Sequence, residues 1–408
     1  MKSLFKPIKK QKPKLFLAIA ILILCILSLC GISADTRVNA EGLQEEKAEE
    51  GYEELSDSVQ DQIENLDLED LQTYLNTLEG FKGKNVKESL LEYVQGGKMD
   101  YGSFFEGLLR VFFSKIAEIM PAFACIAAIA LLSGLLSMLK SSAAGNTASE
   151  MIFLITYAAA LIPLIAVLIE CFQETFEGVS SMTRQMQAVF PLMLTLLSAS
   201  GSSVSAAICR PAVGFFSTTI VTIIETVVLP LTVTMMAFSM AGNLTKELKI
   251  GKFTAFFKSI NKWILGVCAS VFGLFFTVQG ITSATYDGVV RRAAKYAIGN
   301  GVPIVGGFLS GGFDLVVAGS VLIKNSLGSM SIFMMISVLF EPLILLICVT
   351  FMLRLVAATT QPFGDSRISD FLGETADNLQ YCTAGLLITA FLYFLSIVLM
   401  VCCTEALF

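Results

Sequence analysis

The long apolar runs of this chain restrict its possible fold more than any other feature of the sequence. A helix that crosses a bilayer needs about twenty predominantly apolar residues. Six runs reach this length: residues 119–139, 151–171, 214–241, 263–282, 331–353 and 383–403. Because backbone polar groups in hydrocarbon must be satisfied within the segment, these runs favour helices. The sequence therefore predicts an all-α, polytopic membrane domain over residues 103–408.

Two further apolar stretches, residues 186–200 and 299–323, are interrupted by Pro191, by Pro303 and by paired glycines. Proline and glycine weaken a straight span, so each stretch is either a re-entrant segment or a full span. The expected number of transmembrane or re-entrant helices is therefore six to eight.

The second of these stretches is rich in glycine, with small residues at helical spacing. Small residues four apart allow helix backbones to approach closely in a bilayer. The packing glycines are Gly306, Gly307, Gly311, Gly312 and Gly319. We expect a bent or re-entrant segment buried among other helices, with Asp314 at its middle and Lys324 near its end, where a long side chain can reach the interface.

The N-terminus has the pattern of a secretory signal. Six lysines precede the apolar run 15–30, and Val38, Asn39 and Ala40 fit the positions that a signal peptidase reads. We predict a signal peptide over residues 1–40 that is cleaved after Ala40; the alternative is an uncleaved anchor helix. Either arrangement places the following region outside the cytoplasm.

Residues 41–102 form an acidic region. Residues 41–100 hold 17 acidic residues and 5 lysines. Helices are predicted from Asp67 to Gly80 and from Asn85 to Gly96, each with a capping side chain and an apolar face. These faces need a partner, which is either the same chain, the membrane surface or another protein.

The basic segment between Gly242 and Trp263 bears on orientation. It carries five lysines and one glutamate, and Phe253, Phe256 and Phe257 share a helical face. Basic residues favour the cytoplasmic side of a membrane. The pattern predicts an amphipathic helix on the cytoplasmic leaflet.

Two carboxylates fall inside predicted spans next to proline. Glu225 precedes Pro230 by five residues, and Glu341 directly precedes Pro342. Ionisable groups in a bilayer are costly, and a broken helix beside a carboxylate is typical of ion sites in transporters. The alternative is a structural carboxylate that pairs with Arg354, with Lys324 or with a backbone amide.

Enzymatic chemistry finds little support in the sequence. The chain has no histidine, and its ten cysteines lie in or beside apolar runs without a CxxC pair. The glycine-rich stretch fits neither a P-loop nor a dinucleotide fingerprint. We therefore expect no catalytic residues, no metal, no cofactor, no directly bound nucleotide and no nucleic acid.

Two blocks carry a family resemblance. Residues 295–328, KYAIGNGVPIVGGFLSGGFDLVVAGSVLIKNSLG, and residues 361–379, QPFGDSRISDFLGETADNL, resemble the stage III sporulation protein AE family of endospore-forming bacteria. The positions that match its motifs are Pro303, Gly306, Gly307, Asp314, Lys324, Asn325, Gly328, Gln361, Pro362, Gly364, Asp365 and Arg367.

The resemblance implies a multi-pass protein of the mother-cell membrane around the forespore. It also implies partners, namely other membrane proteins of a secretion-like channel complex that forespore development requires, in addition to the lipid bilayer. Residues 366–379 would form an amphipathic connecting helix that Asp365 caps. The rival functions are a stand-alone ion-coupled transporter that uses Glu225 and Glu341 and, further off, an intramembrane enzyme.

Overall fold

The structure is a computed structural model in which the described residues are 45–77, 85–94, 101–140, 146–200, 206–207, 210, 214, 218–244, 250–274, 306–362 and 366–405. The chain divides into two compact units, Met1–Tyr52 and Glu53–Phe408. The second unit includes most of the acidic region. The predicted signal peptide, its cleavage site at Ala40, and Pro303, Gly364 and Asp365 lie outside the described residues.

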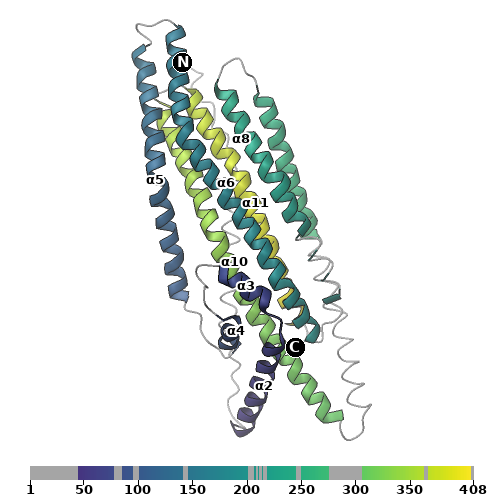
Figure 1. The fold of residues 1–408 in the computed structure, drawn as a ribbon. Coiled ribbons are helices and arrows are strands. Elements are labelled where there is room, and N and C mark those ends of the chain that lie inside the picture. The colour runs from purple at the N-terminus through teal and green to yellow at the C-terminus, as the bar shows by residue number, and fades with distance from the viewer. Residues whose placement is uncertain are drawn as a thin grey trace, which may run out of the picture. The chain divides into compact units, whose positions relative to one another are not determined.

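The described part of the chain is helical and contains no strand. Three antiparallel helix pairs make up the bundle (Figure 1). The first pair is α5 (Tyr101–Lys140) with α6 (Asn146–Ala199), and the last is α10 (Gly306–Thr360) with α11 (Ser366–Glu405). The middle pair runs from residue 218 through η1 (Ile224–Val228) and α8 (Leu229–Leu244), and returns through residues 251–274.

The helical prediction is confirmed, and five of the described helices are long and apolar enough to cross a membrane. They cover residues 106–132, 153–199, 218–244, 315–360 and 367–402, and so include or overlap five of the six predicted runs. The sixth run is helical up to residue 274, and its remainder lies outside the described residues.

The structure differs from the re-entrant interpretation of residues 186–200 and 299–323. Residues up to Ala199 continue α6 without reversal through Pro191, and residues from Gly306 onward continue into Thr360 as one helix of 55 residues. An interior proline removes one backbone hydrogen bond, and a glycine costs about 1 kcal/mol relative to alanine. Continuous packing of these helices against α11 offsets those local costs.

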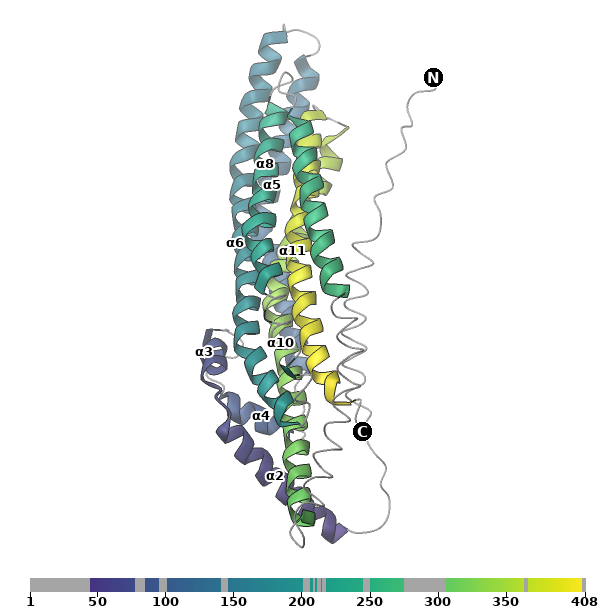
Figure 2. The same ribbon diagram turned by 90° about the vertical axis from the view of Figure 1, so that its right-hand side faces the viewer.

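The acidic region packs on the bundle through its apolar faces. It forms α2 (Glu45–Asn65), α3 (Glu69–Thr77) and α4 (Val86–Val94); α3 contacts α6, and α4 contacts α10 (Figure 2). Leu71, Leu75 and Leu90 are fully buried. Of the partners that the sequence left open, the same chain therefore covers these faces.

Side-chain caps start both short helices, as predicted. The backbone N–H of Glu69 donates to Asp67 Oδ1 at 3.3 Å, and the N–H of Lys87 donates to Asn85 Oδ1 at 3.0 Å. These bonds satisfy N–H groups that the first turn of a helix leaves without a partner.

Two predicted surface helices are instead parts of longer helices. The basic segment enters the helix of residues 251–274, where Phe257 stacks on Phe238 of α8 with ring centroids 5.6 Å apart. Residues 366–379 are the first turns of α11, and their predicted apolar face, including Phe371 and Leu372, is buried. Contacts with neighbouring helices place both segments in the bundle.

Candidate functional site

A layer of charged side chains joins three helices around Lys115. The Lys115 Nζ lies 3.1 Å from Glu341 of α10, 3.8 Å from Glu174 of α6 and 3.5 Å from Glu118 of its own helix α5. Only 13% of the lysine side chain is exposed. One cation therefore neutralises part of the charge of three carboxylates where α5, α6 and α10 meet; we call Lys115, Glu118, Glu174 and Glu341 the charge layer.

Close packing beside the charge layer fixes the contact between α6 and α10. A Cβ atom added to Gly178 would lie 2.9 Å from Cγ of Pro342 and 3.2 Å from Cδ1 of Leu386. Separations below about 3.5 Å are repulsive between carbon atoms. Glycine at 178 therefore allows the ring of Pro342 to rest directly on α6, which places the adjacent Glu341 opposite Lys115.

The partner of Glu341 was missed by the sequence interpretation. Glu341 pairs with Lys115 instead of Arg354 or Lys324. The spacing of Lys115 and Glu118 suggests a pair within one helix, but nothing in the sequence indicates that Lys115 meets a carboxylate more than 200 residues away.

Glu225 lies in a different setting, on the π-helix η1. A π-helix within an α-helix is frequent at functional sites. Glu225 is half-buried, and no ion pair of its carboxylate is found among the described residues. Three residues later, the carbonyl of Val228 accepts a hydrogen bond from Nδ2 of the buried Asn261, and the same Nδ2 donates to Thr232 Oγ1 at 2.9 Å.

A second ionic cluster joins α10, α11 and the helix of residues 251–274. Arg354 lies 3.0 Å from Asp377, and Lys258 Nζ lies 3.9 Å from the other oxygen of the same carboxylate. Each of these side chains is between 37% and 40% exposed. Arg354 of α10 is thus paired with the next helix, α11, and Lys258 links the helix of residues 251–274 to the same carboxylate.

Hydrogen bonds continue this polar contact between α8 and α11. Asn243 donates to Glu374 at 3.2 Å, and buried Asn378 donates to Ser239 Oγ at 3.1 Å. The motif residue Arg367 stacks over the ring of Phe153 in α6, with 3.5 Å from its guanidinium carbon to the ring centroid. The amphipathic face predicted for residues 366–379 therefore binds neighbouring helices on both sides.

The motif residue Lys324 is fully buried, which corrects the expectation that it reaches an interface. Its Nζ donates to the backbone carbonyl of Val401 at 2.8 Å. One turn further, a Cβ at Gly328 would lie 2.7 Å from Cγ2 of Val401. Lys324 and Gly328 therefore hold α10 against the end of α11, with Asn325 half-buried between them.

Polar groups also lie buried where α3, α6, α10 and α11 meet. Gln185 of α6 is fully buried and donates to the carbonyl of Ser331 at 3.1 Å, while Tyr393 packs against Phe190. Burial raises the pKa of the Tyr74 phenol in α3 well above its usual value, against a smaller opposite effect of Arg184. These contacts join α6, α10 and α11 in the buried part of the bundle.

The glycine-rich stretch contacts α2 at Gly319 and Ser320, which meet Gln62. A Cβ at Gly319 would lie 2.7 Å from Nε2 of Gln62, and Ser320 Oγ donates to Gln62 Oε1 at 2.8 Å. Five other predicted positions are helical, and what surrounds them lies outside the described part: Gly306, Gly307, Gly311, Gly312 and Asp314. Gln361 and Pro362 form the exposed start of the turn after α10.

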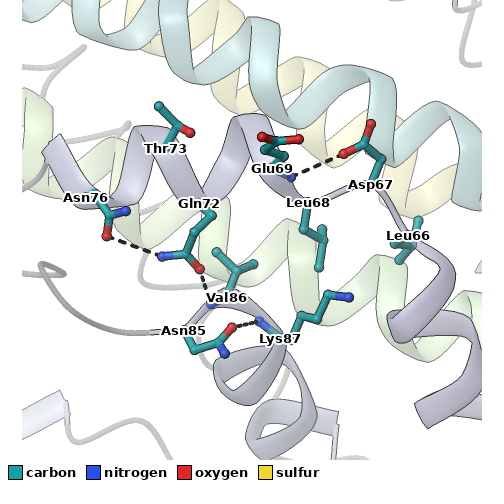
Figure 3. Close-up of a pocket in the computed structure, with 10 residues that line it drawn as sticks. All are labelled: Leu66, Asp67, Leu68, Glu69, Gln72, Thr73, Asn76, Asn85, Val86 and Lys87. Atoms are coloured by element: carbon teal, nitrogen blue, oxygen red, sulfur yellow. Dashed lines mark hydrogen bonds between the residues drawn. The ribbon is translucent and has the colours of Figure 1, made fainter.

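A groove of about 660 Å³ separates α3 from α4 (Figure 3). Gln72 of α3 bridges its walls, because its Oε1 accepts from the N–H of Val86 in α4; its Nε2 donates to Asn76 of its own helix. The lining mixes Asp67 and Glu69 with Lys87. The hydrogen bond between Gln72 and Val86 joins the two helices across the groove.

Among the described residues, no three Asp, Glu or Cys side chains are placed to hold a metal ion. The charge pairs around Glu341 and Arg354 hold helices together within an apolar bundle, and Glu225 is a further carboxylate in it.

Comparison with known proteins gives a consistent result. Residues 84–404 match the family model of stage III sporulation protein AE. The chain is 24% identical over 383 residues to stage III sporulation protein AE of Bacillus subtilis (strain 168), an alignment that covers 93% of this chain and 96% of that protein. No solved structure was found to match.

Proposed function

The chain belongs to the stage III sporulation protein AE family, and from this premise we propose that it is a membrane subunit of a secretion-like channel complex between mother cell and forespore. Family membership over residues 84–404 is the observation that carries the proposal. In this role the protein acts as a multi-pass, non-enzymatic subunit of the mother-cell membrane around the forespore, and the complex is required for forespore development.

The distribution of charge supports one orientation. The helix ends near Lys140, Lys252 and Arg367 lie together at one end of the bundle, and α3 and α4 pack toward the other end (Figure 1). Basic residues favour the cytoplasm, and a signal peptide would export the acidic region. We infer that the basic end faces the mother-cell cytoplasm and that the acidic helices face the space between the two membranes.

Deletion of the gene in the spore-forming bacterium that carries it tests the proposal. We expect forespores to complete engulfment and then to stop developing, with restoration by the full chain supplied at another locus. Normal numbers of mature, heat-resistant spores in the deletion strain would refute the assignment.

Substitution of the two carboxylates separates a complex subunit from a stand-alone transporter. For a complex subunit, a chain with Glu225→Gln and Glu341→Gln should restore sporulation whenever the protein accumulates normally. For an ion-coupled transporter it should fail although the protein is present. Purification in mild detergent is an independent measurement, because a subunit should bring other membrane proteins of the complex with it.

A further inference from the structure

The exposed surface of α6 changes character at the charge layer. From Met151 to Ile169, its exposed positions are apolar, and the large exposed side chains among them are Met151, Leu154, Ile155, Ile162, Ile165 and Ile169, each between 39% and 74% exposed. After Phe176, its exposed positions are charged, polar or small: Glu177, Arg184, Gln187, Pro191, Thr195, Ser198 and Ala199. Lipid favours the first kind of surface, and water favours the second.

The surface of α10 changes at the same level, and that of α5 changes in part. On α10, large apolar side chains are exposed beyond Glu341, at Ile347, Phe351 and Leu355, and none is exposed between Leu322 and Glu341. On α5, Arg110 and Glu118 are exposed before the change together with Leu109 and Phe113, and Met120 and Leu131 are exposed after it. The ion pairs of Lys115 show that these three positions are neighbours in space.

Most of the middle helix pair lies on the apolar side of the charge layer, while Thr218 at its start lines a pocket with Thr183 and Gln187 of α6 beyond the layer. Ile224 of this pair lies beside Gly385 of α11, where an added Cβ would lie 3.1 Å from its side chain, and Gly385 is next to Leu386, which contacts Gly178. Its far end meets Glu374 through Asn243. Phe256, Trp263, Val267 and Leu274 of this pair are exposed.

From these observations we propose that the charge layer marks one edge of the membrane and that the ends of α6, α10 and α11 beyond it stand outside the bilayer. The membrane-embedded belt then consists of six segments: residues 119–140, 146–173, 218–244, 251–274, 342–360 and 366–389. At 1.5 Å per residue each is roughly 30–40 Å long, which matches a hydrocarbon core of about 30 Å.

The projecting half of the bundle is long. By the same rise, residues 306–341 of α10 extend roughly 54 Å beyond the belt and residues 174–199 of α6 roughly 39 Å. Most of their large apolar side chains face the core between α6, α10 and α11, or face α2, α3 and α4, as in a water-soluble bundle, while Phe176, Val316 and Leu322 are exposed. This placement is independent of the sporulation role.

The belt also accounts for the second ionic cluster. Arg354 lies 13 residues, or about 20 Å, from Glu341, and therefore near the opposite edge of the belt. Long basic side chains such as Arg354 and Lys258 can reach the interface from this depth.

The lone tryptophan allows a direct test with vesicles whose phosphatidylcholine carries brominated acyl chains, which quench indole fluorescence within the hydrocarbon. The full chain carries Trp263→Phe and one new tryptophan at an exposed position of α6. Ile162→Trp and Ile155→Trp probe the belt, and Gln187→Trp and Thr195→Trp probe the projecting half. Unchanged helix content and a single size-exclusion peak identify folded variants.

We expect loss of fluorescence in brominated vesicles for Ile162→Trp and Ile155→Trp and no loss for Gln187→Trp and Thr195→Trp. Aqueous acrylamide should quench the second pair more strongly than the first. Quenching of Gln187→Trp and Thr195→Trp by the brominated lipid would overturn the proposal, as would the absence of quenching for Ile162→Trp and Ile155→Trp. The assay uses purified protein, so its result does not depend on the channel function.

Discussion

Replacing Gly178 by alanine should weaken the contact between α6 and α10. The new Cβ would lie 2.9 Å from Cγ of Pro342, a ring atom that is held by its own helix backbone and cannot rotate away. To reach an ordinary carbon separation of about 3.5 Å, the two helices must move apart by roughly 0.6 Å. Such overpacking costs about 1–3 kcal/mol of unfolding free energy.

A matched substitution separates this cost from helix propensity. Alanine stabilises a helix by about 1 kcal/mol relative to glycine, so Gly178→Ala gains this amount as well. Gly373→Ala in α11 gains it with nothing within 4 Å of the new Cβ. The difference between the two variants should therefore be about 1–3 kcal/mol, with Gly178→Ala the less stable.

Denaturant unfolding of both variants in the same detergent, followed by helix content, measures the difference. Equal stability of Gly178→Ala and Gly373→Ala would refute the close approach of Pro342 to α6. A larger side chain, as in Gly178→Val, should destabilise further, because its methyl groups meet both Pro342 and Leu386.

Three further substitutions test other contacts. Lys115→Met leaves three carboxylates facing one another and should lower the melting temperature in detergent. The control Arg110→Met removes an exposed ion pair and should leave the melting temperature unchanged. Equal effects of the two substitutions would contradict the charge layer. Asn85→Ala removes the cap of α4 and should cost about 1 kcal/mol, measured as faster hydrogen exchange of that helix alone. Gly319→Leu should displace α2 and speed its proteolysis, while Gly107→Leu, which meets no neighbour, should not.

Local features of the N-terminal helices follow from the sequence. Asp67 and Asn85 cap helices where they were expected, because capping depends on residues one to three positions apart. The buried faces of α3, α4 and the first turns of α11 were also predicted, since apolar periodicity directly indicates which side is covered.

The partners of the charged residues could not be predicted in the same way. Glu341 was identified as a costly group, but its contact with Lys115 depends on how α5 and α10 pack, and Lys324 was expected near an interface although it is fully buried. Proline and glycine suggested breaks in α6 and α10 because local propensity omits the packing that holds a long helix together.

The sequence by itself determined an all-α chain, its apolar runs and its family, because length, hydropathy and motif are properties of neighbouring residues. Only the tertiary structure decided which apolar residues face the outside. Residues 331–341 and 390–403 are as apolar as a span, yet most of their large side chains pack against other helices. Hydropathy measures only the preference for leaving water, and a lipid surface and a protein core satisfy that preference equally.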